Sequence, residues 1–358
     1  MVKNEKVAAA LVFLLTLLLI MGCSPGQEGT EGEPKGEIYE FSLAHFQPAT
    51  HPVETVLIQG WIEAIEEATD GRVQITSFPG ETLLPGTEIY EGVVDGAADI
   101  GHSAYAYTRG CFPVMESFLV PGIPYSNAMV ADRVAMAGIE KLEPGELQEV
   151  KHLFTFSTGR GDLLMQQPLK ELEDLSGVEI GVTAGQFAEA VRLLGATGSV
   201  FTMPEHYEVI SRGMTQGVLA PMEVLRSFRI AEVTGYVTQT PFLYNQLLFM
   251  VMNQEKWDAL PPDLQRTIEE VTGDYYEEVV AGFYDRLNEE VLDWIEEEGL
   301  DLEIITLSEE EAERWKDRLD PILEEHKTYL EEKGLPGEDI METVLELADE
   351  YNQLYGNR

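Results

Sequence analysis

Apolar and polar positions alternate in short stretches at the start of the chain's globular part, and helical spacing separates those stretches. Residues 39–45 and 72–78 follow a period of two, which predicts strands. Residues 53–68 and 88–94 carry apolar side chains at helical spacing, and residues 95–101 lead into a third short strand. This β-α-β-α-β order predicts a parallel sheet with right-handed crossovers.

In a parallel sheet of this kind, ligands bind at the carboxyl ends of the strands. The residues at those ends are His45, with the loop that follows it, and the stretch from His102 through Ser103 to Tyr105. We therefore expect His45, Ser103 and Tyr105 to line a site.

The middle of the chain repeats the same plan. Residues 178–182, 200–203 and 217–221 predict strands, and residues 184–194 predict a helix. Pro204 stands at the favoured first position of another helix. The two halves share a β-α-β order without sharing sequence.

The segment from Phe154 to Asn253 organises the two halves. We expect the chain to leave one lobe near Arg160, to build a second lobe and to return near Asn245. The predicted fold class is therefore α/β, a two-lobe periplasmic-binding-protein-like fold (type II-like) with a ligand cleft between the lobes.

After Asn253 the pattern changes to long acidic helices. Residues 261–298 predict one helix, 302–306 predict a short strand, and the spacing of Ser308 and Glu311 is that of a capping box. The predicted division is a lobe 1 of residues 37–157 and 271–310, a lobe 2 of residues 158–270, and C-terminal helices of residues 311–358 that pack on the lobes.

The N-terminus has the pattern of a secretory signal. Lys3 and Lys6 precede an apolar run that ends in Gly22, so residues 1–22 predict a signal peptide. Cys23 directly after that glycine resembles the lipobox of bacterial lipoproteins, in which this cysteine is lipidated; a plain signal peptide with a chance cysteine is the alternative. Residues 23–36, rich in Gly, Pro and Glu, predict a flexible linker.

Cysteine count and charge narrow the class of protein. If Cys23 is lipidated, Cys111 has no partner and the chain has no disulfide. The formal net charge of −42 argues against nucleic acid as a partner, because phosphates would be repelled. A surface adapted to salt or high pH explains this charge. Specific calcium binding is the alternative, but the chain has no EF-hand pattern.

Motifs of catalysis are missing from the sequence. It has no G-x-S-x-G elbow, no H-E-x-x-H, no P-loop and no dinucleotide-binding fingerprint. His45 and His51 lie on a proline-containing loop at a spacing that matches no common metal site. We expect no enzyme activity, no metal and no cofactor.

Several blocks, in collinear order from Tyr39 to Glu298, resemble the substrate-binding subunits of tripartite ATP-independent periplasmic (TRAP) transporters, the DctP family. They are Asp70–Ile75 with Phe78–Gly80, Glu88–Gly101, Leu172–Ile180, and Leu247–Asn253 with Trp257 and Leu260–Gln265. The resemblance implies an extracytoplasmic receptor, held at the cell membrane through lipidated Cys23. Such a receptor captures a small organic acid or related solute and delivers it to the membrane permease of a sodium- or proton-coupled importer.

The resemblance also implies ligand contacts. Two arginines typically bind the ligand carboxylate in this family, and guanidinium suits a carboxylate because it offers two parallel hydrogen bonds. One of them corresponds to Arg160, whereas Gly181 stands at the position of the principal one, and Gln216 replaces a further family aspartate. Asn245 matches a position that hydrogen-bonds the ligand.

The glycine at position 181 leaves two hypotheses open. Either Arg160 alone carries an acidic group, or the ligand is not a simple carboxylate. Gly181 would leave space for a bulkier or aromatic ligand, and four large side chains are expected near the cleft, with core packing as the alternative role for each: Met203, Met222, Phe242 and Tyr244.

Two other functions are kept as alternatives. A solute-binding lipoprotein of an ATP-driven importer has a similar two-lobe design, and two integral membrane subunits without an ATPase in neighbouring genes would argue against it. A lipid-anchored sensor or enzyme on the same scaffold is the other alternative, which a fused signalling partner or a product formed from the bound compound would favour.

Overall fold

The computed structural model describes residues 36–108 and 110–356. The predicted signal peptide, Cys23 and nearly all of the predicted linker lie outside these residues. Ile38–Arg358 forms one compact unit, which contains two β-sheets.

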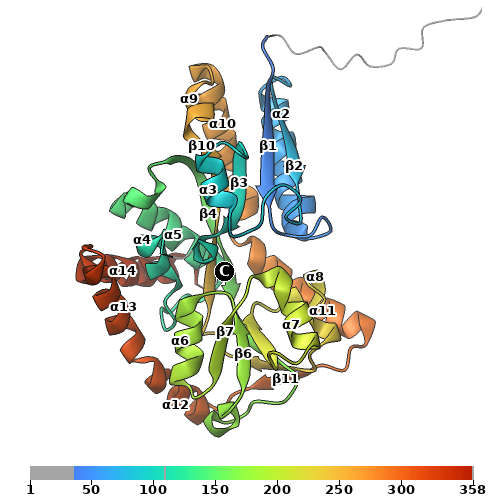
Figure 1. Ribbon diagram of the computed structural model, residues 1–358, viewed down its shortest axis with the longest axis vertical. Helices are drawn as coiled ribbons and strands as arrows, with labels where there is room; N and C mark the ends of the chain where they lie inside the picture. Colours follow the sequence, from blue (N-terminus) through green and yellow to red (C-terminus); the bar gives the residue numbers. More distant parts are fainter. Residues whose placement is uncertain (1–35, 109, 357–358) are drawn as a thin grey trace, which may run out of the picture. The chain divides into compact units, whose positions relative to one another are not determined.

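The first sheet has five strands in the order β2-β1-β3-β10-β4. As the sequence predicts, β1, β2 and β3 are parallel, and the helices α2 and α3 lie between them in the chain. β10 runs antiparallel to both β3 and β4 (Figure 1). The bounds are β1 Tyr39–His45, α2 Gln59–Ala68, β2 Val73–Phe78, α3 Ile89–Val94, β3 Ile100–Ala104, β4 Val150–Arg160 and β10 Asn245–Asn253.

The second sheet has six strands in the order β11-β9-β5-β8-β6-β7. β6 pairs in parallel with β7 and β8, which confirms the predicted second β-α-β arrangement, and β5 runs antiparallel to β8 and β9. The bounds are β5 Asp162–Met165, β6 Glu179–Val182, α6 Gly185–Leu193, β7 Thr197–Val200, α7 His206–Ser211, β8 Gly217–Ala220, α8 Val224–Ser227, β9 Tyr236–Gln239 and β11 Glu303–Thr306.

The chain passes between the sheets at the two predicted places. β4 ends at Arg160 and β5 starts at Asp162, and the return lies between the end of β9 and Asn245. Two strands do not belong to the sheet that the predicted lobe boundaries would give them. β10 lies in the range 158–270, predicted for lobe 2, but joins the first sheet. β11 lies in the range 271–310, predicted for lobe 1, but joins the second sheet. The apolar run in the sequence predicts that β10 is buried, which it is. The sheet to which β10 belongs depends instead on the strands that pair with it, which the apolar run does not specify.

The helix predicted over residues 261–298 is broken. It forms α10 Pro262–Tyr275, a π-helical segment Tyr276–Val280 and α11 Phe283–Glu298. Gly282 has a φ of 72°, a conformation that glycine adopts without steric cost. Its freed N–H donates to the buried Asp132 carboxylate at 2.7 Å, which also accepts from the N–H of Ser157. Asp132 therefore stabilises the break.

The remaining helices cover both sheets. α5 Ala128–Leu142 packs on β4 and against α14 Gly337–Tyr355, and α12 Glu309–Leu319 contacts α6 beside the second sheet (Figure 1). Pro321 starts α13 Pro321–Glu332 directly after α12. The two other helices are α4 Pro113–Glu116 and α9 Gln254–Asp258. The C-terminal helices thus contact elements that belong to both sheets.

Candidate ligand-binding cleft

A small cavity of about 30 Å³ lies between the carboxyl ends of strands from the two sheets. Phe46 and Gln47 follow β1, Tyr107 follows β3, and Thr183, Met203 and Glu223 follow β6, β7 and β8. Thr158 of β4, Tyr244 before β10, Gln246 of β10 and Tyr284 of α11 complete its wall. This is the position expected for a ligand in a parallel α/β sheet.

The Gln246 amide in the cavity wall is buried, and neither of its polar atoms has a hydrogen-bond partner among the described residues. The hydroxyls of Thr158 and Thr183 contact the Tyr244 phenol through side-chain hydrogen bonds, which lower its pKa in part, although burial raises that pKa to about 12. A buried polar group without a partner costs about 1–3 kcal/mol, which makes the Gln246 amide the first candidate for contact with a bound molecule.

Glu223 is the one charged residue among those that line this cavity. It is 5% exposed, and its Oε2 accepts a hydrogen bond of 2.5 Å from Ser227 Oγ. Its Oε2 also lies 3.4 Å from Nε2 of His51, which belongs to the loop after β1. His51 and Glu223 therefore connect the two sheets across the cleft.

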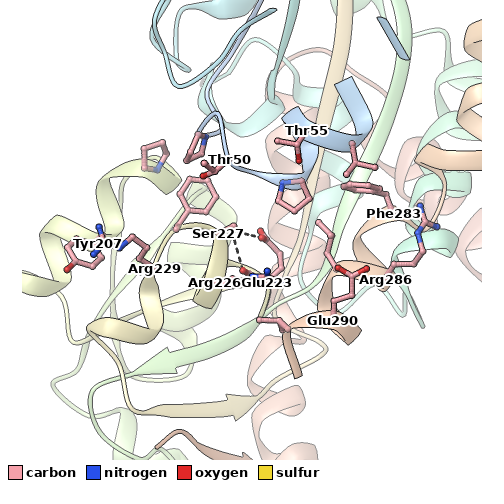
Figure 2. Close-up of a pocket in the computed structure, with 17 residues that line it drawn as sticks. Thr50, Thr55, Tyr207, Glu223, Arg226, Ser227, Arg229, Phe283, Arg286 and Glu290 are labelled. Carbon is pink, nitrogen blue, oxygen red and sulfur yellow. Dashed lines mark hydrogen bonds between the residues drawn. The ribbon is translucent and has the colours of Figure 1, made fainter. Parts of the chain in front are cut away.

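A larger pocket of about 880 Å³ adjoins the cavity and shares Glu223 and Phe228 with it (Figure 2). Three arginines line this outer pocket, and each makes a contact of its own. Arg229 donates to Glu232 at 2.7 and 2.9 Å, Arg286 donates to the Val279 carbonyl at 2.6 Å, and Arg226 lies over the Trp294 ring. The outer pocket is thus the more basic side of the cleft.

His45 lies beside the cavity in a buried hydrogen-bond chain, not in its wall. Its Nε2 is 2.9 Å from Glu54 Oε2, and its Nδ1 is 3.2 Å from Gln47 Oε1. Gln47 Nε2 continues the chain to His102 at 2.9 Å. Burial, and then the nearby His45, lower the pKa of His102 to about 3, so this ring is neutral at physiological pH. The chain fixes Gln47, which does line the cavity.

Ser103 and Tyr105 point into the core of the first sheet and do not line the cavity. Ser103 Oγ donates to the Gly86 carbonyl at 2.7 Å, and the Tyr105 hydroxyl bonds to Thr155 Oγ1 at 2.6 Å. Both side chains are buried. The predicted strand end is present at Ala104, but Tyr105–Tyr107 forms a 3-10 turn, in which residues three apart share a face. Ala104 and Tyr107 therefore line the cavity, and Tyr105 does not.

Arg160 and Asn245 do not line the small cavity either. Arg160 is exposed and lines two other pockets, of about 670 and 480 Å³. Asn245 is buried, with its Oδ1 accepting from Ser157 Oγ and its Nδ2 donating to the Phe118 carbonyl at 3.2 Å. Ligand contact by these two residues remains a prediction, and the structure gives Asn245 a packing role.

Gly181 does not open space for a ligand. A Cβ added there would lie 2.6 Å from Nδ1 of His206 and 3.2 Å from the Gly217 carbonyl. The imidazole of His206 therefore fills the space that the sequence suggested for a ligand. Burial lowers the pKa of His206 to about 4, although a hydrogen bond with the Phe201 backbone raises it in part.

The large side chains predicted near the cleft divide between two pockets. Met203 and Tyr244 line the small cavity. Met222 and Phe242 line the 480 Å³ pocket together with Arg160. The sequence analysis did not predict Thr158, Thr183 and Gln246 as site residues. Thr158 is two residues from Arg160, and Gln246 follows Asn245 directly. Their position next to predicted site residues is the one sequence feature that could have identified them.

Within the described ranges 36–108 and 110–356, no cluster of three or more potential metal ligands occurs, and no helix is both long and apolar enough to cross a bilayer. Cys111 is exposed and is not in a disulfide.

Known proteins resemble this chain in sequence and in fold. A family model described as "Bacterial extracellular solute-binding protein, family 7" (DctP) matches residues 43–329. The C4-dicarboxylate-binding protein DctB of Bacillus subtilis is 24% identical over 294 residues, which are 80% of each chain.

Two solved structures are similar in fold. A marine metagenome TRAP solute binding protein, from an unidentified microbe and specific for aromatic acid ligands, has a TM-score of 0.83 at 20% identity, covering 88% of this chain and all of the other. A TRAP periplasmic solute binding protein from Bordetella bronchiseptica, with bound (R)- and (S)-mandelate, has a TM-score of 0.78 at 25% identity, covering 87% of this chain and 99% of the other.

Proposed function

Because the chain belongs to family 7 of the bacterial extracellular solute-binding proteins, the DctP family of TRAP transporters, we propose that it captures a small organic acid or related solute in the cavity between its sheets. It is an extracytoplasmic binding protein and not an enzyme. The solute would be handed unchanged to a membrane permease.

One observation carries this proposal, namely the unpartnered amide of Gln246 in a cavity with aromatic walls. Drug-sized ligands occupy pockets of about 300–1,000 Å³, and about 30 Å³ holds about two water molecules. The solute would therefore enter when the sheets move apart, and the walls would close on it. In the closed state the Gln246 amide and the Thr158 and Thr183 hydroxyls would bond to the solute.

The class of solute follows from the relatives and from the cavity walls. Structurally similar proteins bind aromatic acids and mandelate, and a sequence relative is a C4-dicarboxylate-binding protein. Five aromatic rings line this cavity, which favours a ligand with a flat or apolar body: Phe46, Tyr107, Phe228, Tyr244 and Tyr284. Neutral donors can hold its polar end.

A binding screen tests the proposal. The melting temperature of the purified protein would be measured with benzoate, 3-hydroxybenzoate, mandelate, C4-dicarboxylates, amino acids and betaines, because a molecule that binds only the folded state raises it. Gln246→Leu should abolish the rise, whereas Gln353→Leu, a change of the same kind on exposed α14, should keep it. A rise that survives in Gln246→Leu would place the solute elsewhere.

Membrane attachment and transport belong to the same proposal. Lipidation of Cys23 is supported by the signal-like residues before it and the linker after it. Cys23→Ser should release the protein from membranes, and retention of this variant on them would exclude the lipid anchor. Uptake by the complete system should follow an ion gradient and not ATP, whereas uptake driven by ATP would favour an ATP-driven importer.

A further inference from the structure

We infer that the solute of this protein carries a cationic nitrogen within its apolar body, as a betaine does, in addition to any carboxylate. This inference rests on the proposed function, because it names the chemical class that the same cavity selects. Three features of the cavity wall support this inference: its charge, its aromatic rings and its neutral hydrogen-bond donors.

The cavity wall has a carboxylate and no cation. Glu223 is its one charged residue, Arg160 lines other pockets, and position 181 is glycine. The arginines of the outer pocket are engaged with Glu232, the Val279 carbonyl and the Trp294 ring. A plain organic anion would thus meet Glu223 without an arginine in the cavity wall to oppose the repulsion.

Two polar side chains lie beside the Glu223 carboxyl group. His51 Nδ1 accepts a hydrogen bond of 3.0 Å from the N–H of Val53, and its Nε2 lies 3.4 Å from Glu223 Oε2 without making a hydrogen bond there. The Ser227 hydroxyl donates to the same oxygen (Figure 2). Among the described residues no lysine or arginine forms an ion pair with Glu223. A cationic group on the ligand would therefore compensate this buried acidic group best.

Five aromatic rings line the same cavity as the Glu223 carboxyl group. Phe46 follows β1, Tyr107 follows β3, Phe228 follows α8, Tyr284 belongs to α11, and Tyr244 lies in the return segment. The negative faces of such rings attract a quaternary or protonated nitrogen, most strongly where water is excluded. Rings together with a carboxylate form the kind of site that holds an alkylated ammonium group.

The other polar groups of the wall are neutral. Gln246 Nε2 and the hydroxyls of Thr158 and Thr183 can donate to a carboxylate, because neutral donors also bind an anionic oxygen. A zwitterion would thus place its nitrogen near Glu223 and the rings and its carboxylate near Gln246.

Matched pairs of probes test this inference. Glycine betaine and 3,3-dimethylbutyrate differ by one quaternary nitrogen in place of carbon, and so do N-methylpyridinium-3-carboxylate and 3-methylbenzoate. Titration calorimetry on the intact protein should show at least about tenfold tighter binding of the nitrogen member of a pair. Glu223→Gln should remove that preference. Glu290→Gln, the same charge change at an exposed position of the outer pocket, should keep the preference.

Phe228→Leu is a second test that does not depend on Glu223. It removes an aromatic ring but keeps an apolar side chain, so it should reduce the preference for the nitrogen member of each pair. Equal or tighter binding of the carbon members, or a preference that survives in folded Glu223→Gln, overturns the inference and leaves the proposed function standing. Binding of organic acids in the screen without binding of either nitrogen probe also overturns it. No binding of any probe or screened compound counts against the proposed function itself.

Discussion

Arg160 and Asn245 are register partners where β4 meets β10, yet neither side chain reaches the cavity between the sheets. Asn245 uses both of its polar atoms to join β4 and the Phe118 carbonyl. Arg160 extends toward pockets on which the return segment Pro241–Phe242 also borders. Their sequence neighbours Thr158 and Gln246 line the cavity instead.

Arg160→Ala tests whether this arginine holds the solute. Because its side chain is exposed and lines other pockets, we expect the dissociation constant of the solute identified in the screen to change by less than about threefold, or about 0.6 kcal/mol. Titration calorimetry would measure it. A loss of tenfold or more would restore the carboxylate-binding role that the family resemblance implies.

Gln246→Leu should weaken solute binding and raise stability. Both polar atoms of the Gln246 amide are buried without a hydrogen-bond partner among the described residues, and leucine is close to glutamine in size. We expect the free energy of unfolding of the ligand-free protein to rise by about 1 kcal/mol, while solute binding weakens. Urea unfolding and calorimetry measure the two quantities. Weaker binding without greater stability would mean that the amide already has partners in the fold.

Gly181→Ala should destabilise the second sheet, because the new methyl group would overlap the His206 ring. We expect a loss of about 1–3 kcal/mol in the free energy of unfolding, typical of overpacking. Gly185→Ala, where a Cβ meets nothing within 4 Å, is the matched control and should be close to neutral.

A double-mutant cycle identifies the partner of that methyl group. In a His206→Ala background the Gly181→Ala change should cost less, because the overlapping ring is absent. An equal cost in both backgrounds would assign the strain to the Gly217 carbonyl, which lies 3.2 Å from the added Cβ.

His206 also predicts a pH dependence of stability. Burial lowers its pKa to about 4 in the folded protein, against about 6.5 in the unfolded chain, so below about pH 6.5 the unfolded state binds the additional proton. Stability from this residue is complete above pH 6.5 and is lost as the pH falls toward 4. Between pH 7 and 5 the loss is about 2 kcal/mol.

His206→Leu isolates that contribution, since other buried groups titrate equally in both proteins. The variant should lose about 2 kcal/mol less than the parent between pH 7 and 5 in urea unfolding. Parallel curves for the two proteins over this range would mean that the ring is accessible to protons in the folded state.

The parallel pairing within each half could be predicted from the sequence, because strands that alternate with helices along the chain form a parallel sheet. The crossing at Arg160 and Asn245 followed as well, because long apolar runs bounded the segment between them. Sheet membership of β10 and β11 did not follow, because it depends on pairing between residues far apart in the chain. The break at Gly282 was also missed, since Asp132, which stabilises it, lies 150 residues away.

The site residues were harder to predict than the fold. The ends of β1 and β6 were placed correctly, but the strand predicted over residues 200–203 is β7, Thr197–Val200. Ser103, Tyr105 and Asn245 face the core, and hydrophobic period alone does not say which side of a strand faces the other sheet. The space beside Gly181 could not be judged from the sequence either, because the side chain that occupies it, His206, comes from another element of the fold. Gln246 becomes a candidate only when its lack of a hydrogen-bond partner is seen in three dimensions.

Tyr107→Phe should favour the open form of the protein. The Tyr107 hydroxyl, after β3, accepts a hydrogen bond of 2.7 Å from the N–H of Met203, after β7, so this bond joins the two sheets. Its loss leaves a buried N–H unpaired only while the cleft is closed, which costs the closed form about 1–3 kcal/mol. Small-angle scattering should show a larger radius of gyration for the ligand-free variant.

Tyr105→Phe is the matched control, because it removes a phenol hydroxyl that bonds Thr155 within the first sheet. It should lower stability without opening the cleft. Equal radii of gyration for the two variants would mean that the Tyr107 hydrogen bond does not hold the sheets together.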